Sequence, residues 1–309
     1  MKFFSDREGH NIPRNKEQID IPVWNGICAI ILELVSNNSL SEAFPMDCED
    51  GRGVCGCDFI ALQDRVNAII PNLEIPVRRI DINPYAIKNE FDFIEDEGEK
   101  KSPINTVAVL DLIELIHSCI SDPKKVGEYH TFFSHYHYRF EHNGENQRVF
   151  REHINELFAR NGIAYTLTEE GIIHRVLPAP VGNIVTQHIK TSDARLNTLL
   201  NEAFANILIP NKANRVVALE RIWDAFERLK TYYSIDKKTS IEQVITKLSA
   251  GNALFETYLE DECKKLTEIG NKFQIRHFEK GKEEIKIEAQ IDYFFFRMLA
   301  FVNLFLNSI

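Results

Sequence analysis

Hydrophobic residues recur at helical spacing along most of the chain. Stripes of this kind predict helices over residues 21–37, 58–70 and 105–120, separated by a loop at 46–58 and a strongly charged stretch at 95–101. A further stripe consists of Phe150, Ile154, Leu157 and Phe158. It ends at Asn161-Gly162, a pair typical of a left-handed helix end.

The clearest strand pattern lies directly after that helix. Ile163, Tyr165 and Leu167 alternate with small or polar residues, and a second alternation follows at Ile172, His174 and Val176. Between them, Glu169-Glu170-Gly171 can form a three-residue turn with glycine in the left-handed position. The segment therefore predicts a β-hairpin, packed on the preceding helix because an isolated hairpin is only marginally stable.

From Ser192 onward the pattern is helical to the end of the chain. One long stripe runs from Leu219 to Tyr233, and Thr239 with Glu242 is a plausible capping box for the next helix. Leu259 to Phe273 defines a long helix, and 292–309 supplies the last one. Several such apolar faces suffice for a helical bundle.

Length and composition favour two globular domains. A chain of 309 residues with 44% hydrophobic and 27% charged residues can bury a sizeable core, and chains of this length commonly divide. We expect a mainly α protein with an N-terminal α+β domain at 1–185, containing a small β-hairpin, and a C-terminal helical bundle at 190–309. The net charge of −10 excludes a protein that clamps nucleic acid over its whole surface. The acidic excess lies in the first two thirds, so a local basic groove near the C-terminus remains compatible with it.

The chain shows no pattern of export or membrane insertion. Its first residues lack the apolar stretch of a secretory signal, and the longest apolar run, Tyr293 to Leu306, is interrupted and short of the roughly 20 residues of a membrane span. We expect a cytoplasmic protein without a membrane partner. The six cysteines are then expected to be free thiols.

The segment 270–282 contains the best candidate site. Arg276 and His277 follow Phe273 by three and four residues, so on a continuing helix both would point to the bundle side or its edge. An imidazole that moves protons at the ribose 2′-hydroxyl and a guanidinium that stabilises the phosphate charge are what metal-independent RNA cleavage uses. The alternative is a helix C-terminus where cations satisfy the last carbonyls.

A second cluster combines histidines with aromatic residues between Tyr129 and His142. Its histidines are His130, His135, His137 and His142. A His-x-His pair places two imidazoles on one face if the segment is extended, which suits a metal, whereas the interleaved aromatics with Arg139 nearby resemble a base-stacking surface. A structural core is the third interpretation. A metal-dependent enzyme that uses His130, His135 and His137 is therefore one of the functions left open.

The remaining motifs point to no further chemistry. Cys48, Cys55 and Cys57 lack the paired spacing of a zinc site, and no Gly-rich phosphate loop, GxSxG or HExxH motif is present. ATP-driven and serine-hydrolase chemistry are disfavoured. From the sequence we assign no metal ion and no cofactor.

Two parts of the chain resemble known families. The opening 4–9, the segment 130–140, the helix 150–158 and the hairpin 162–175 resemble the N-terminal domain of AbiJ-type abortive-infection proteins. The segment 218–224 and Ile275-Arg276-His277 resemble a HEPN domain. In the usual HEPN pattern a histidine follows the arginine after four to six residues, where this chain has Gly281, Lys282 and Glu283.

The resemblance implies an antiphage or toxin-like protein that acts on RNA. It implies a helical bundle that dimerises through the C-terminal helices and places Arg276 and His277 of each copy in a shared catalytic cleft. Lys272, Lys280 and Lys282 are then the expected RNA-binding residues. The alternative is a catalytically inactive homodimer that binds RNA or serves as a scaffold, consistent with the apolar stretch 294–296. The sequence does not identify an antitoxin.

Overall fold

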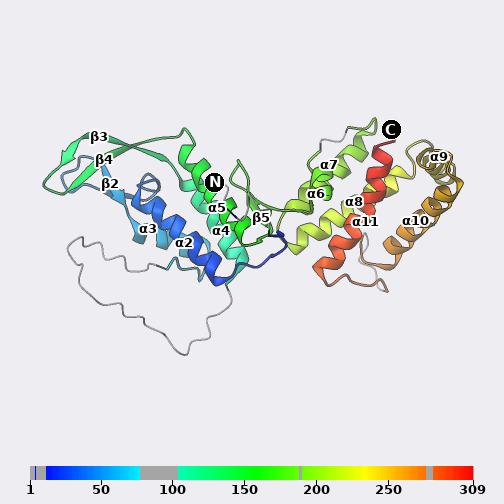
Figure 1. Cartoon of the computed structure of the whole chain (residues 1–309), viewed down its shortest axis with the longest axis horizontal. Helices are drawn as coiled ribbons and strands as arrows, with labels where there is room; N and C mark the ends of the chain where they lie inside the picture. Colours follow the sequence, from blue (N-terminus) through cyan, green and yellow to red (C-terminus); the bar gives the residue numbers. More distant parts are fainter. Residues whose placement is uncertain (1–3, 5–11, 77–103, 188–189, 276–280, 309) are drawn as a thin grey trace, which may run out of the picture. The chain divides into compact units, whose positions relative to one another are not determined.

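The chain folds into two compact units with separate hydrophobic cores, Met1–Ile173 and His174–Ile309. A computed structural model describes residues 4, 12–76, 104–187, 190–275 and 281–308 (Figure 1). Within these residues the structure has ten helices and three small antiparallel sheets of two strands each. The predicted mainly α fold class is therefore confirmed. The predicted charged stretch at 95–101 lies outside the described residues.

Side-chain caps begin three of the four long helices in the first unit. These helices are α2 (Ile21–Ser36), α3 (Phe59–Ile69), α4 (Thr106–Cys119) and α5 (Glu145–Arg160). Asp20, Asp58 and Asn105 accept hydrogen bonds from the first-turn amides of α2, α3 and α4, which satisfies donors that a helix start leaves unpaired. All four helices were predicted. Gly162, at φ +71°, follows α5 as the sequence indicated.

The core of the first unit joins α2, α4 and α5. Gly26 of α2 lies so close to α5 that a Cβ there would be 3.1 Å from the Leu157 side chain. Ile31 of α2, Ile113 of α4 and Phe158 of α5 are fully buried in this core. The helices thus form the support on which the strands of this unit rest.

Three two-stranded hairpins follow in chain order, and the last one ends at the boundary between the two units. They are β1 (Pro45–Asp47) with β2 (Val54–Cys57), β3 (Asp122–His130) with β4 (His135–Glu141), and β5 (Tyr165–Leu167) with β6 (Ile173–Arg175). The first pair occupies the segment that the sequence predicted to be a loop. That prediction was wrong because these short strands pair with each other, and because β2 packs against β4 from a distant part of the chain.

The predicted third hairpin is present, but its second strand buries the opposite face. Gly171 has the expected left-handed backbone at φ +79°. Ile172 is half exposed, whereas Ile173 and Arg175 are buried. The sequence pattern predicted the other face because residue 175 is an arginine, a residue type usually found at the surface. Its guanidinium is nevertheless buried against the carboxylate of Asp292.

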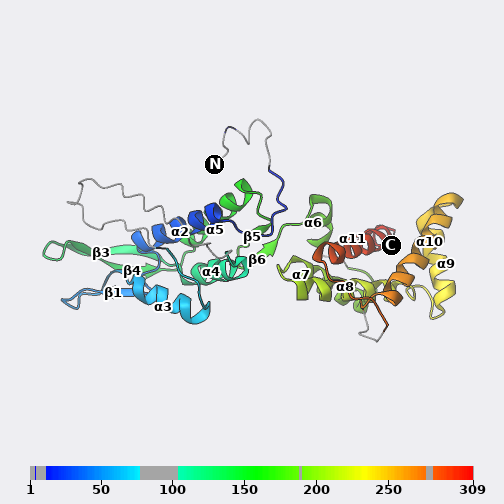
Figure 2. The same ribbon diagram turned by 90° about the horizontal axis from the view of Figure 1, so that it is seen from below.

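The second unit is a helical assembly. Its helices are α6 (Ala179–Val185), α7 (Ala194–Leu208), α8 (Lys212–Leu229), α9 (Lys237–Ser249), α10 (Ala253–Lys272) and α11 (Glu288–Leu306). α8 packs against both α7 and α11, and α9 lies beside α10 (Figures 1 and 2). Trp223 of α8 and Phe295 of α11 are almost fully buried in this core.

Two helix ends differ from the sequence expectation. Asp236, not Thr239, caps α9, because its carboxylate accepts hydrogen bonds from both the amide and the hydroxyl of Thr239. Helix α10 ends at Lys272, and Phe273 has an extended backbone. The helical spacing from Phe273 to the following residues therefore does not apply.

One helix among the described residues, α11, is long and apolar enough to cross a membrane. Length and composition alone are weak grounds, since a core helix satisfies the same criteria. Ile291, Phe295 and Val302 of α11 are buried in the core of the second unit.

Candidate metal centre

The β3–β4 hairpin gathers three histidines on one of its faces. His130 at the end of β3 pairs with His135 at the start of β4, so their side chains leave the sheet in the same direction. His137 lies two residues beyond His135 on an extended strand, which places it on that face as well. The sequence predicted that the two imidazoles of the His-x-His pair share one face if the backbone is extended, and His135 and His137 do lie on an extended strand.

A β-bulge in β3 sets the pairing register between β3 and β4 at the histidines. Val126 pairs with His137 and His130 pairs with His135, so β3 advances by four residues while β4 advances by two. Gly127, at φ +69°, takes up part of the excess. Bulges commonly re-aim a side chain, and here the bulge sets His130 opposite His135.

The fourth member of the cluster, Cys48, comes from the β1–β2 hairpin. It directly follows β1, and the turn is closed by hydrogen bonds from the Cys48 amide to the Gly53 carbonyl (2.9 Å) and from the Gly51 amide to the Cys48 carbonyl (2.8 Å). Gly51 and Gly53 both have positive φ, which the tight turn requires. The thiol is thereby turned toward the histidines of β3 and β4.

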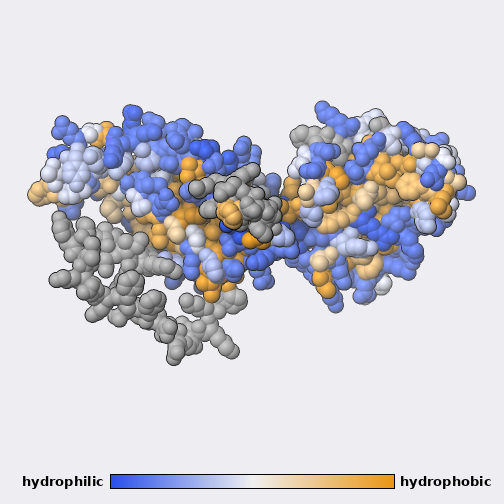
Figure 3. Space-filling model, in the orientation of Figure 1, coloured by the Kyte–Doolittle hydropathy of each residue, from blue (hydrophilic) through white to orange (hydrophobic). Residues whose placement is uncertain are grey.

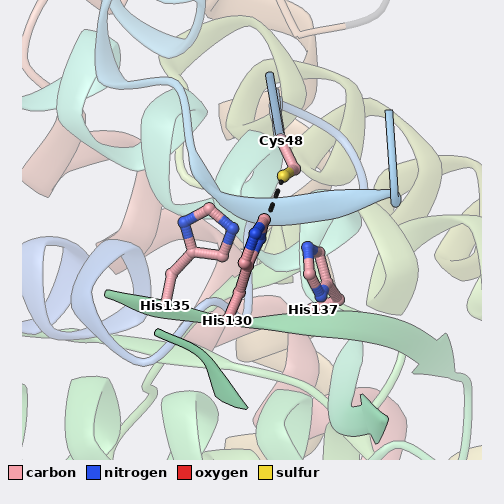
Figure 4. Close-up of side chains that lie close together, drawn as sticks. All are labelled: Cys48, His130, His135 and His137. Carbon is pink, nitrogen blue, oxygen red and sulfur yellow. Dashed lines mark hydrogen bonds between the residues drawn. The ribbon is translucent and has the colours of Figure 1, made fainter. Parts of the chain in front are cut away.

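The four side chains meet in a small volume. Figure 4 shows the three imidazoles standing on the hairpin and Cys48 facing them from the neighbouring segment. One nitrogen or sulfur atom from each residue lies within 4.8 Å of all the others. The Cys48 Sγ to His130 Nδ1 distance is 3.5 Å. Tetrahedral zinc bonds of about 2.3 Å to sulfur and about 2.0–2.1 Å to nitrogen imply a sulfur-to-nitrogen edge of roughly 3.5 Å.

The cluster lies largely out of contact with solvent. Cys48, His130 and His137 are buried, and His135 is half-buried. Burial lowers the pKa of His137, and the nearby imidazoles of His135 and His130 lower it further. Buried Nε2 atoms of His135 and His137 have no hydrogen-bond partner among the described residues. A buried polar atom without a hydrogen bond lowers the stability of the folded state, so a ligand such as a bound metal ion is one physical reason for its position.

The second nitrogen of His130 has a carboxylate partner. His130 Nε2 lies 3.2 Å from Asp50 Oδ2, while its Nδ1 faces Cys48. The order carboxylate, imidazole, thiol also occurs in thiol hydrolases. Here Cys48 is only 4% exposed, so a substrate would not reach its sulfur, and the arrangement suits a buried ligand set better.

A cavity of about 650 Å³ adjoins the cluster. His130 and His137 line it together with Arg52, Tyr129 and Arg139, among others. Phe132 at the hairpin tip is 85% exposed, and Lys125 stacks on the Tyr136 ring at 4.0 Å. The aromatic and basic character noted in the sequence is therefore partly at the surface of this hairpin.

Other residues of the predicted clusters lie apart from this centre. Cys55 donates to the Met46 carbonyl at 3.3 Å, and Cys57 is buried in the hydrophobic core of the first unit. His142 is exposed and lies 3.4 Å from Glu42. The sequence grouped Cys48 with the other two cysteines, whereas the structure brings Cys48 alone to the histidines.

The predicted RNA site is described only at its edges. Arg276, His277 and Lys280 lie outside the described residues. Lys272 is exposed, and its Nζ forms an ion pair of 2.5 Å with Glu268. The Lys282 carbonyl accepts a hydrogen bond of 3.0 Å from the Gln274 side chain.

The second unit also contains a buried charge cluster that sequence reasoning missed. Arg175 Nη2 lies 2.7 Å from Asp292 Oδ2, and Arg215 Nη1 lies 3.3 Å from the same oxygen. Arg215 also lies 3.0 Å from Glu288. Both arginines are buried. The one hint in the sequence is the pair Glu288 and Asp292, two like charges four residues apart on one helix, whose mutual repulsion calls for cations nearby.

Comparison with known proteins identifies one family. Residues 2–191 match the family model described as AbiJ N-terminal domain 4. No curated protein and no solved structure matches the chain significantly.

Proposed function

Because the chain belongs to the AbiJ N-terminal domain 4 family, which indicates an abortive-infection, antiphage role, we propose that it exerts this role on RNA. In this proposal the AbiJ-type domain spans 1–185 and senses infection or binds a partner. A HEPN-like helical domain at 190–309 acts on RNA. Arg276 and His277 are its catalytic residues, and cleavage needs no metal ion.

The main support comes from the backbone hydrogen bonds at the two ends of the segment that contains Arg276 and His277. The Gln274 amide donates to the Glu283 carbonyl at 2.8 Å, and the Glu283 amide donates to the Lys272 carbonyl at 2.9 Å. The two ends of the segment that contains Arg276 and His277 are thus held together beside α10 and α11. A catalytic pair requires such a fixed base, because small displacements of the reacting groups cost large factors in rate.

The cations around the segment support RNA as the ligand. Lys272 and Lys282 flank it, and Lys280 lies within it. The second unit lacks the acidic excess of the first two thirds of the chain, so phosphate groups meet less repulsion there. We assign these three lysines to phosphate contacts.

A second function is a homodimeric scaffold or inactive RNA-binding protein. Its support is the apolar surface near α11, where Ile287 and Tyr293 are each 58% exposed. Figure 3 shows hydrophobic residues at the visible surface of both units. Phe295 is fully buried and Phe294 and Phe296 pack partly against the core, so these phenylalanines offer less contact area than the sequence suggests. In either function we propose a cytoplasmic protein that dimerises through its C-terminal helices.

RNA degradation by the full-length protein tests the proposal. Arg276→Ala and His277→Ala are compared with the wild type, first with a chelator and then with added divalent metal. The matched control is Lys264→Ala, which removes an exposed cation of α10 away from the segment. We expect cleavage in the chelator, lost in the first two variants and kept in the control.

The outcomes separate the two functions. No cleavage of diverse RNAs by folded wild type, with RNA binding or dimerisation unaffected by Arg276→Ala, favours the scaffold. If the protein binds RNA, replacing Lys272, Lys280 and Lys282 together should weaken binding and lower the salt slope by roughly one for each lost phosphate contact. Equal effects of Lys264→Ala and Arg276→Ala would contradict the assigned site.

A further inference from the structure

We propose that Cys48, His130, His135 and His137 bind one zinc ion, which fastens the β1–β2 hairpin to the β3–β4 hairpin. The site is independent of any action on RNA, since all four residues lie in the first unit. Its ligands come from two segments, with Cys48 separated from the nearest histidine by 82 positions in the sequence.

The ligand types select the metal class. A thiolate with three imidazoles suits zinc, because sulfur and nitrogen donors in a tetrahedral arrangement are its preferred set. All four positions are filled by protein groups, as in structural zinc sites, whereas catalytic sites keep one position open. The ion would thus serve to hold the two hairpins together.

The geometry already approaches such a site. The 3.5 Å between Cys48 Sγ and His130 Nδ1 equals the sulfur-to-nitrogen edge that a zinc tetrahedron requires. The ligand atoms that lie up to 4.8 Å apart need to approach one another by about 1.5 Å or less. The buried Nε2 atoms of His135 and His137 have no partner among the described residues. Metal binding accounts for the position of these two imidazoles next to His130 and the Cys48 thiol.

Asp50 supplies the outer partner that zinc-binding histidines usually have. With Nδ1 on the metal, His130 Nε2–H donates to Asp50 Oδ2, which lies 3.2 Å away. Such a carboxylate fixes the tautomer and orients the ring. One turn, 48–53, therefore carries both the ligand Cys48 and the residue that orients the ligand His130. Zinc binding displaces the Cys48 thiol proton to solvent, so the bound centre consists of Zn²⁺, one thiolate and three neutral imidazoles.

The test measures metal binding to the full-length chain, purified without a histidine tag. The protein is stripped with a chelator and titrated with Zn²⁺ and, separately, with Co²⁺ as a spectroscopic probe. We expect one equivalent of zinc, and with cobalt the visible bands of a tetrahedral site together with a thiolate-to-cobalt charge-transfer band. Cys48→Ser should remove the charge-transfer band, and His137→Gln should weaken binding.

Two matched controls and one graded variant sharpen this result. Cys55→Ser removes a thiol from the same hairpin, and His142→Gln removes an imidazole beyond the end of β4; both should bind zinc as the wild type does. Asp50→Asn should keep the stoichiometry of one and lower the affinity by about 10- to 100-fold.

A measurement on the wild type guards against variants that fail to fold. Zinc should raise the thermal unfolding midpoint of the first unit and protect Cys48 from alkylation, and the chelator should reverse both effects. Folded wild type that binds no zinc, or zinc binding that survives Cys48→Ser and His137→Gln unchanged, overturns the proposal. Alkylation of Cys48 at the same rate with and without zinc also overturns it.

Discussion

Asp292 holds two buried arginines of the second unit, so its neutralisation should destabilise that unit strongly. Its Oδ2 lies 2.7 Å from Arg175 Nη2 and 3.3 Å from Arg215 Nη1. The two arginine side chains are 6% and 3% exposed, against 16% for Asp292. In Asp292→Asn both guanidinium groups keep their charge but lose the carboxylate, and water has little access to compensate.

The size of the loss follows from this burial. Removing one partner of a buried ion pair costs about 3–5 kcal/mol, because a charge stays buried without compensation. Glu288 remains 3.0 Å from Arg215 and is 41% exposed, so part of the compensation survives. We therefore expect the lower end, about 3 kcal/mol, or a fall of roughly 10 °C in the unfolding midpoint of the second unit.

Tryptophan fluorescence during urea unfolding measures this loss in the second unit alone. The chain has two tryptophans, and a Trp24→Phe background leaves Trp223, which is buried in the core of the second unit. The control is Glu262→Gln, which disrupts a bidentate pair with Arg297 whose side chains are about one third exposed. Such a pair contributes about 1 kcal/mol or less. A loss in Asp292→Asn no greater than in Glu262→Gln would refute the reasoning.

Two further predictions concern packing and pH. In Gly270→Ala the new Cβ would lie 2.3 Å from Trp223 Nε1. The overpacking should cost about 1–3 kcal/mol of unfolding free energy, more than the roughly 1 kcal/mol that alanine gains in helix propensity. The control, Asn271→Ala on the exposed side of the helix, should not destabilise the unit in the same urea assay. Burial and the charge of Arg151 lower the pKa of His117 in the folded state below its unfolded value of 6.5, so the unfolded state takes up a proton more readily. The unfolding free energy of the first unit should therefore be unaffected by His117 above about pH 6.5 and should decrease as the pH falls below that value. In His117→Gln this decrease should be smaller. An unchanged pH profile in that variant would show that His117 does not contribute.

The sequence alone determined most of the helices, because their signals are local. Asp20, Asp58 and Asn105 stand directly before apolar stripes, and the structure uses each as a cap. The turn at Gly171 was equally readable, since its left-handed backbone is a property of the residue itself. The mainly α class followed from these local patterns.

The tertiary structure decided which distant side chains meet. Cys48 and His130 are 82 positions apart, and no spacing rule connects a cysteine in one hairpin with histidines in another. The register that aligns His130 with His135 depends on the bulge in β3, which local alternation does not reveal. Arg175 is buried because its guanidinium forms an ion pair with Asp292 and donates to the Ile207 carbonyl of α7, although a charged residue is usually found at the surface. Local propensity fixes helices and turns because their contacts are short-range, whereas the zinc-ligand cluster and the buried charges arise from long-range packing.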